Sequence, residues 1–498
     1  DFDVVRGSAA TRVNAEGLIE DISILSGELV TNGDFSNGST DWTLGAKWSI
    51  GSGFVQLISN DSTGSSLTPN TTTISGSKYK CSFDAVVNSG SCKLQSSSGV
   101  TYQIIDETKT YNFNFVADSS DLFFNRLSSV SGITITNISI IEVTDATNIP
   151  RIDYTDGTAS ILLEPQSTNL ITHSEDFSQW GAVNSTLLSN NAISPSSEAN
   201  ASKLVESIGN SAHGVSYNYS STSSMAFSVF AKASERTFIQ MQAAGVGSTD
   251  CIFNLSNGTI VSTESNATAS IKDYGNGWYR CSIHYSSAGT NNPIIKVYNG
   301  SDSYQGDGTS GVYIWGAQLE ALSYATSYIP TSGAIATRLA DSVTGAGDAT
   351  TFNSTEGVLY VEMAKQQDDN DSFILISLNN AASLSDTNSV TIGFNNNTNF
   401  YLRVKSNGVI SFIDQNITAN KNQFYKVALR YKSGDISAFV DGVNVSSSTS
   451  AFSFGAALDV LSFDYNANNV LPFYGNVKDV RTYNTALTDA ELLTLTTI

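Results

Sequence analysis

Charged residues are scarce in this chain of 498 residues. They make up 14% of it, roughly half the usual share in soluble domains. Ser, Thr, Asn and Gly take their places. Because helices favour Lys, Glu, Arg and Ala whereas strands do not depend on them, this composition argues against a mostly helical fold.

Positive charge is scarcer still. The chain has 25 Lys and Arg against 46 Asp and Glu, a net charge of −21. Phosphate backbones and anionic lipid surfaces repel such a protein, and no run of 18 apolar residues could span a bilayer. We therefore expect neither nucleic acid binding nor membrane insertion. The first 17 residues contain no apolar signal region, which fits assembly in a cytoplasm, or secretion only if a signal has been removed.

Cysteine and histidine are too few and too dispersed to build a common active site. None of the four cysteines lies in a CxxC or Cys/His cluster: Cys81, Cys92, Cys251 and Cys281. They are either small buried apolar residues or include a disulfide such as Cys251–Cys281. None of the three histidines has the neighbours of a catalytic triad or a zinc site: His173, His213 and His284. No spacing selects a carboxylate pair for glycoside hydrolysis, so we expect no enzyme.

Alternation of apolar and polar residues is present along most of the chain. It is clear in 111–118, 425–431 and 436–442, and period two is typical of half-buried strands. Turn dipeptides such as Asn257-Gly258 separate these runs. A helix is indicated only near the end, where Thr488 and Glu491 form a capping box. The sequence therefore predicts an all-β protein made of β-sandwich or jelly-roll domains.

An internal repeat organises the first two thirds of the chain. Residues 28–42 (ELVTNGDFSNGSTDW) match 169–180 (NLITHSEDFSQW), and 132–143 match 311–322. Both copies contain a Phe followed by a Trp, which we place as plugs at one end of a sheet-on-sheet core. Two copies of one sandwich module are predicted.

These patterns divide the chain into segments joined by short connectors, which should hold the domains in a rigid linear array. The predicted segments are an N-terminal connecting or attachment segment (1–27), an inserted β-sandwich (28–145), a connector (146–167), a second sandwich of the same type (168–327), a linker (328–344) and a C-terminal jelly roll (345–498).

The C-terminal segment resembles the concanavalin-like, laminin-G-type jelly rolls. The resemblance rests on 424–445 (FYKVALRYKSGDISAFVDGVNV) and 473–495 (FYGNVKDVRTYNTALTDAELLTL). The matching positions that we treat as structural are Asp441, Gly442, Gly475 and Arg481. Members of that family bind glycans or proteins, often with calcium, so the resemblance implies a binding domain.

The segment 28–42 resembles the opening of family 4/9/22-type carbohydrate-binding modules. That resemblance implies a structural calcium near Asp34, and near Asp176 in the second copy. Ser36 replaces the Glu usual in the family, which weakens the ligand set. The alternative is that both aspartates only cap turns.

The segment 148–180 resembles one found in many phage tail and virion surface proteins. Residues 4–22 resemble what normally precedes it, so we infer that 28–145 is an insertion. Within the motif we expect Arg151 to pair with a carboxylate such as Glu164, with Asp153 beside it. A structural ion pair is favoured over a ligand contact.

Aromatic side chains in loop-rich surroundings are the candidates for stacking on sugars. They are Trp48, Tyr102, Tyr217 and Tyr219. Trp278 and Trp315 lie in apolar strands and are expected in the core.

Together these patterns predict a non-catalytic virion surface protein, a tail or head fibre or receptor-binding component that attaches to host-surface glycans. It would contact other virion proteins, need no cofactor beyond calcium, and lie on the virion surface after assembly in the host cytoplasm. A homo-oligomer, a trimer first, would also cover the apolar face of the N-terminal segment (Val4, Val5, Val13, Leu18, Ile19). The alternatives are a purely structural decoration or connector, and an exported bacterial adhesin.

Overall fold

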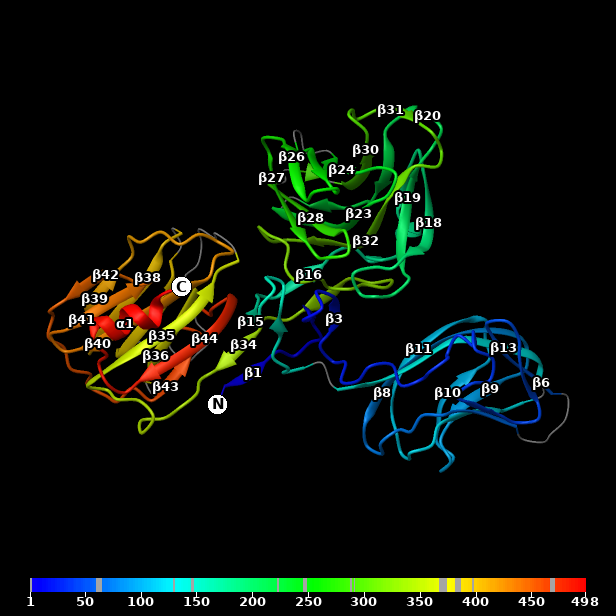
Figure 1. The fold of residues 1–498 in the computed structure, drawn as a ribbon, viewed down its shortest axis with the longest axis horizontal. Coiled ribbons are helices and arrows are strands. Elements are labelled where there is room, and N and C mark those ends of the chain that lie inside the picture. Colours follow the sequence, from blue (N-terminus) through cyan, green and yellow to red (C-terminus); the bar gives the residue numbers. More distant parts are fainter. Residues whose placement is uncertain are drawn as a thin grey trace. The chain divides into compact units, whose positions relative to one another are not determined.

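The computed structural model describes residues 2–59, 65–128, 130–144, 147–221, 224–244, 249–286, 289–290, 292–366, 374–380, 387–395, 398–465 and 471–498. The fold is nearly all β, as predicted. The chain forms two compact units: Asp1–Glu20 joins Thr147–Ile498 in one, and Asp21–Ala146 forms the other (Figure 1). The second unit is thus an insertion in the first. None of the described helices has the length and apolar composition needed to cross a bilayer.

The inserted unit is a sandwich of two five-stranded antiparallel sheets. One sheet contains, in spatial order, β10 (Thr101–Ile105), β9 (Cys92–Gln95), β12 (Phe123–Arg126), β7 (Ser66–Pro69) and β4 (Trp42–Leu44). The other contains β11 (Lys109–Val116), β8 (Lys78–Ser89), β13 (Val130–Val143), β6 (Val55–Ser59) and β5 (Trp48–Ile50). Side chains from both sheets meet in one apolar core, which includes Cys81 and Cys92.

The larger unit begins with a second sandwich, built from two six-stranded sheets. One sheet contains β17 (Gly181–Val183), β21 (His213–Ser216), β30 (Asn292–Tyr298), β24 (Phe238–Ala244), β25 (Cys251–Asn254) and β26 (Thr259–Thr263). The other contains β18 (Ser185–Ala192), β19 (Ala201–Glu206), β32 (Gly311–Glu320), β23 (Met225–Ala233), β28 (Trp278–Tyr285) and β27 (Ala267–Asp273). Cys251 and Cys281 are free and buried here, as are Cys81 and Cys92 in the inserted unit.

The two sandwiches share the expected aromatic plug. Phe35 and Trp42 have ring centroids 5.0 Å apart, and Phe177 and Trp180 have theirs 5.1 Å apart, with similar tilts of 41° and 47°. In each pair the indole N–H donates to a backbone carbonyl of its own opening segment. The sequence repeat therefore corresponds to a repeated structural element.

The C-terminal domain consists of a seven-stranded and a five-stranded sheet. The first contains β14 (Ile152–Asp153), β15 (Ser160–Leu163), β44 (Gly475–Tyr483), β35 (Glu356–Ala364), β40 (Tyr425–Lys432), β41 (Ile436–Val440) and β42 (Val443–Ser448). The second contains β39 (Val409–Asp414), β38 (Phe400–Ser406), β37 (Ser389–Phe394), β36 (Ile374–Asn379) and β43 (Val460–Ser462). Helix α1 (Asp489–Thr496) follows, with the predicted capping box formed by Thr488 and Glu491.

The connector between the sandwiches is itself part of a sheet. β14 and β15 form a hairpin, and Ile161 pairs with Val477 of β44. Our prediction of a connector at 146–167 missed this pairing, because the partner strand lies more than 300 residues further along the sequence.

The N-terminal segment also belongs to the larger unit. β1 (Asp3–Val5) pairs with β34 (Ser342–Thr344), and β2 (Thr11–Val13) pairs with β3 (Ile19–Asp21). Val13 and Ile19 are buried against Trp278 and Trp315. The apolar face that we expected an oligomer to cover is therefore partly covered within the chain, while Val5 remains exposed. The remaining short pairs are β16 (Ser167–Asn169) with β33 (Ala336–Arg338), β20 (Gly209–Ser211) with β31 (Tyr304–Gly306), and β22 (Ser220–Ser221) with β29 (Gly289–Thr290).

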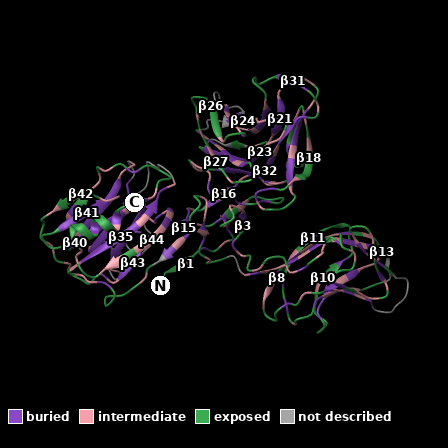
Figure 2. Cartoon of the chain, viewed as in Figure 1, coloured by how far each residue is buried: buried purple, intermediate pink, exposed green. Residues whose placement is uncertain are grey.

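Burial follows the sheets closely (Figure 2). Strands in the middle of each sheet, such as β23 and β41, are buried along nearly all or all of their length. The edge strand β26 is exposed at every residue.

Candidate functional site

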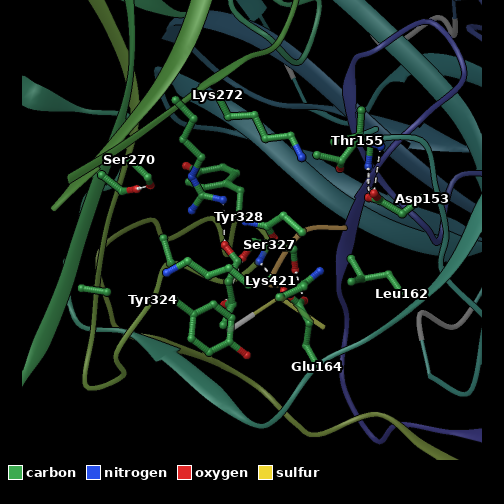
Figure 3. Close-up of a pocket in the computed structure, with 18 of the residues that line it drawn as sticks. Asp153, Thr155, Leu162, Glu164, Ser270, Lys272, Tyr324, Ser327, Tyr328 and Lys421 are labelled. Atoms are coloured by element: carbon green, nitrogen blue, oxygen red, sulfur yellow. Dashed lines mark hydrogen bonds between the residues drawn. The ribbon is translucent and has the colours of Figure 1, made fainter. Parts of the chain in front are cut away.

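A pocket of about 460 Å³ lies in the larger unit, on the outer face of the sheet that contains β27 and β28 (Figure 3). Lys272 lies directly opposite Arg280, Ser270 opposite Ser282 and Thr268 opposite His284. Because side chains alternate between the two faces of a sheet, these three pairs lie on the face away from the core, and all six line the pocket. The floor is therefore a polar stripe.

The walls come from four segments distant in the sequence. They are β2, the turn after β14, the loop 323–328, and residues of the C-terminal domain. The C-terminal domain contributes Lys365, Gln366, Lys421, Asn422, Phe424 and Asn476. Eight Ser or Thr, three Tyr and three Asn or Gln side chains line the pocket together with apolar and charged ones, in a volume within the usual range for small-ligand sites.

The charges around the pocket differ from those of the whole chain. Five cationic side chains line it (Arg12, Lys272, Arg280, Lys365, Lys421), against three carboxylates (Asp153, Asp156, Glu164). The chain as a whole has nearly twice as many acidic as basic residues. The pocket lining thus has more basic than acidic side chains, although the protein as a whole is acidic.

Each of the three carboxylates is held by other groups of the chain. Asp153 accepts hydrogen bonds from the backbone N–H groups of Val13 and Thr155, both at 2.9 Å. Asp156 pairs with Lys478 at 3.0 Å, and Glu164 is part of a buried network of arginines.

That network lies beside the pocket and joins the ends of the larger unit. Arg151 contacts Glu164 at 2.6 Å and also contacts Asp341, while Arg338 contacts Glu164 at 2.9 Å. Arg6 contacts Asp341 at 2.7 Å, and all five side chains are at most 2% exposed. The N-terminal segment, the connector and the linker are therefore fixed to one another here.

The network also sets the charge state of Glu164. Burial alone would raise the pKa of this carboxyl, but the guanidinium groups of Arg338 and Arg151 outweigh burial and lower the pKa to about 2. Glu164 is therefore ionised across the physiological range.

Arg280 is buried in the floor, and its partners in the described part of the chain are uncharged. It donates to the Thr326 carbonyl at 2.7 Å and to Ser228 Oγ at 3.0 Å, and its guanidinium lies 5.2 Å from the centre of the Phe230 ring. Its Nε is buried without a hydrogen-bond partner.

Lys272 reaches across the pocket toward Asp153 and Thr155 (Figure 3). Lys272 is exposed as a whole, but partial desolvation by the surrounding residues lowers its pKa, while Asp153 and Asp156 act in the opposite direction. No described carboxylate forms an ion pair with it.

The predicted sugar-stacking aromatics lie outside this pocket. Trp48, expected to be exposed, is 5% exposed, because its ring fills the core of the inserted unit and its indole N–H donates to the Ser65 carbonyl. Tyr102 is half-buried and donates to Asp118. Tyr217 packs on Trp180, and Tyr219 lies against the second core.

The two aspartates proposed as calcium ligands sit in turns. Asp34 is exposed and accepts the N–H of Ser36. Asp176 caps the short 3-10 helix Phe177–Gln179 by accepting from Ser178. Across the residues described, no group of three or more His, Cys, Asp or Glu could hold a metal ion.

Comparison with known proteins identifies one part of the chain. Residues 349–493 match the model of the concanavalin A-like lectin/glucanases superfamily. The C-terminal domain is concanavalin-like. No curated protein matches the chain.

Solved structures give remote likenesses. The CBM40 of the Ruminococcus gnavus IT-sialidase is 16% identical with a TM-score of 0.26, covering 31% of this chain and 93% of that one. Domain 4 of AbnA, a GH43 arabinanase from Geobacillus stearothermophilus, is 17% identical with a TM-score of 0.25, covering 33% and 77%. The Trypanosoma rangeli sialidase is 8% identical with a TM-score of 0.25, covering 99% and 98%.

The motif residues of the concanavalin-like domain shape its turns and edges. Asp441 and Gly442 form the two-residue turn between β41 and β42 with φ of 47° and 77°, as a type I′ hairpin requires. A Cβ on Gly475 would lie 2.2 Å from the Ala364 carbonyl oxygen. Arg481 pairs with Asp479 at the surface.

Sequence reasoning found part of the ion network but not the pocket. The expected contact of Arg151 with Glu164 is present, although the two amino groups of Arg151 bind different carboxylates instead of one. Lys272 and Arg280 were missed. The signal available was two cations on neighbouring alternating strands, whose register the sequence does not show.

Proposed function

We propose that this chain is a non-catalytic glycan-binding protein. The observation that carries the proposal is that the concanavalin-like domain contributes side chains to a saccharide-sized pocket rich in hydroxyls, amides and tyrosines. Sugars are bound by such groups, with aromatic rings packing on their faces.

The carboxylates of the pocket support a role without catalysis. Glycoside hydrolysis needs one carboxylic acid that keeps its proton near neutral pH and a second, free carboxylate. Glu164 is held ionised by two arginines, while Asp153 and Asp156 are engaged by backbone amides and Lys478. Glu164 is thus not suited to act as the acid.

We further propose that the protein lies on the surface of a virion, as a tail or head fibre or receptor-binding component that contacts other virion proteins and attaches to host glycans. The support is the resemblance of residues 148–180 to phage virion proteins. A trimeric assembly belongs to the same proposal.

The test is glycan-array and host-cell binding by the full chain. Ser270→Trp would fill the floor of the pocket and should abolish binding. Ser262→Trp places the same bulk on the exposed strand β26 and should leave binding intact. A folded chain that binds no glycan and no cell would refute the proposal.

The buried arginine network favours a second candidate, a rigid structural connector. It fixes three segments of the larger unit through ion pairs at most 2% exposed. If the protein is such a connector, the wild type and both Trp variants should all fail to bind any glycan.

A further inference from the structure

Two cations face each other in the floor of the pocket. Lys272 and Arg280 are directly opposite on paired strands, an arrangement that destabilises a sheet because like charges repel. Neither forms an ion pair with any described residue.

Four of the five other arginines that are buried in the described part of the larger unit contact carboxylates, whereas Arg403 contacts the hydroxyls of Ser389 and Tyr465. Arg6, Arg151 and Arg338 each contact a buried carboxylate at the network. Arg280 is only 8% exposed, yet its partners are a carbonyl, a hydroxyl and a ring. Since a buried charge gains from a partner of opposite charge, a negative group bound in the floor would be stabilised by Arg280.

The position of Arg280 is fixed in advance of any ligand. The Thr326 carbonyl and Ser228 Oγ hold its two amino groups, and its strand lies in the middle of the sheet between β23 and β27. Lys272 is on the edge strand and is exposed, so its ammonium can approach a ligand from the pocket mouth. Arg280 is therefore held in one position, whereas the Lys272 side chain can adjust to a ligand.

Beyond the charged pair, the same stripe offers hydroxyls. Ser270 and Ser282 are next along the two strands, with their hydroxyl oxygens 2.6 Å apart. Tyr274 and Tyr324 line the pocket as well. An anionic group with a hydroxylated ring attached would match this order of side chains.

We propose that Lys272 and Arg280 bind the anionic group, carboxylate or sulfate, of an acidic saccharide whose ring lies over Ser270 and Ser282. This rests on the proposed glycan binding and adds the class of glycan. The attraction is local, since charges further than about 8 Å are screened at physiological salt, so the acidity of the whole chain does not prevent it.

The test measures binding of the full chain to trigalacturonate, a sulfated galactan tetrasaccharide and a neutral galactan tetrasaccharide by calorimetry. We expect an acidic probe to bind and the neutral one not to. Lys272→Gln should weaken binding of the acidic probe at least about tenfold, which is the effect expected from the loss of one charge contact. Comparison of the carboxylate and sulfate probes decides which group the site takes.

The matched control is Lys232→Gln. Lys232 lies on β23 of the same sheet, also without an ion pair among the described contacts, but outside the pocket. Lys232→Gln removes the same charge as Lys272→Gln and should leave the binding of the acidic probe unchanged. Lys272→Glu should abolish binding and raise the thermal unfolding midpoint, because it gives Arg280 an ion-pair partner.

The outcomes separate this inference from the proposed function. Array glycans that are all neutral, or acidic ligands whose affinity is the same in Lys272→Gln, would overturn the inference and leave glycan binding standing. A chain that binds no array glycan and none of the three probes would overturn both.

Discussion

At the scale of single residues, the buried ion network is the most sensitive part of the molecule. Arg151 contacts both Glu164 and Asp341, and its side chain is fully buried. Arg151→Ala removes one of the two arginines that each of these carboxylates contacts, and breaking a buried pair typically costs about 3–5 kcal/mol. Urea unfolding of the variant should show this loss.

The matched control is Arg481→Ala. Arg481 also pairs with an aspartate, but 55% of its side chain is exposed, and exposed pairs contribute about 0–1 kcal/mol. Equal losses from the two variants would contradict the assigned role of the network.

The same network predicts a dependence of stability on pH. The pKa of Glu164 is about 2 in the folded protein, below its ordinary value of 4.5. A carboxyl whose pKa is depressed by folding stabilises the folded state above its unfolded pKa, and this contribution is lost as the pH falls through 4.5 toward 2. Unfolding free energies of the wild type and Glu164→Gln should therefore converge as the pH falls through this window. A constant difference between them would contradict the prediction.

At the scale of elements, helix α1 depends on its cap. Thr488 accepts the N–H of Glu491, whose carboxylate binds back to the N–H of Thr488. Thr488→Ala removes this cap at a cost of about 1 kcal/mol and should speed hydrogen exchange of the α1 amides. Thr494→Ala lies in the same helix without a capping role and should leave exchange unchanged or slower, since alanine favours helix.

Local pattern predicted the elements better than their partners. Alternation in 425–431 and 436–442 identified the strands β40 and β41, and the Asp441-Gly442 pair marked the turn from β41 into β42, because both signals lie within a few residues. The hairpin of β14 and β15 was missed because its sheet is completed by β44. Arg151 and Glu164 belong to one sequence motif, so their contact could be predicted. Asp341 lies 190 residues further along the sequence, so its contact with Arg151 could not. Lys272 and Arg280 look like ordinary surface residues until the strand register places them together.

At the scale of the whole molecule, the inserted unit is separable. It has its own apolar core, and the rest of the chain forms a unit without it. Replacing 21–146 with a short Gly/Ser linker should leave the larger unit folded. Its thermal midpoint and its binding to any glycan that depends on Lys272 should be retained. Loss of cooperative unfolding would show that the insertion is needed for the fold.

The contact between Arg6 and Asp341 spans 335 residues of sequence, and this has a consequence for synthesis on the ribosome. The inserted unit can finish folding soon after residue 146 has emerged, whereas β1 and Arg6 must wait until the segment around Asp341 and β34 has been made. Domains generally fold as units during translation, and contacts between distant residues form slowly. Arg6 and β1 are therefore among the last parts of this unit to reach their final place, although they are translated well before Asp341.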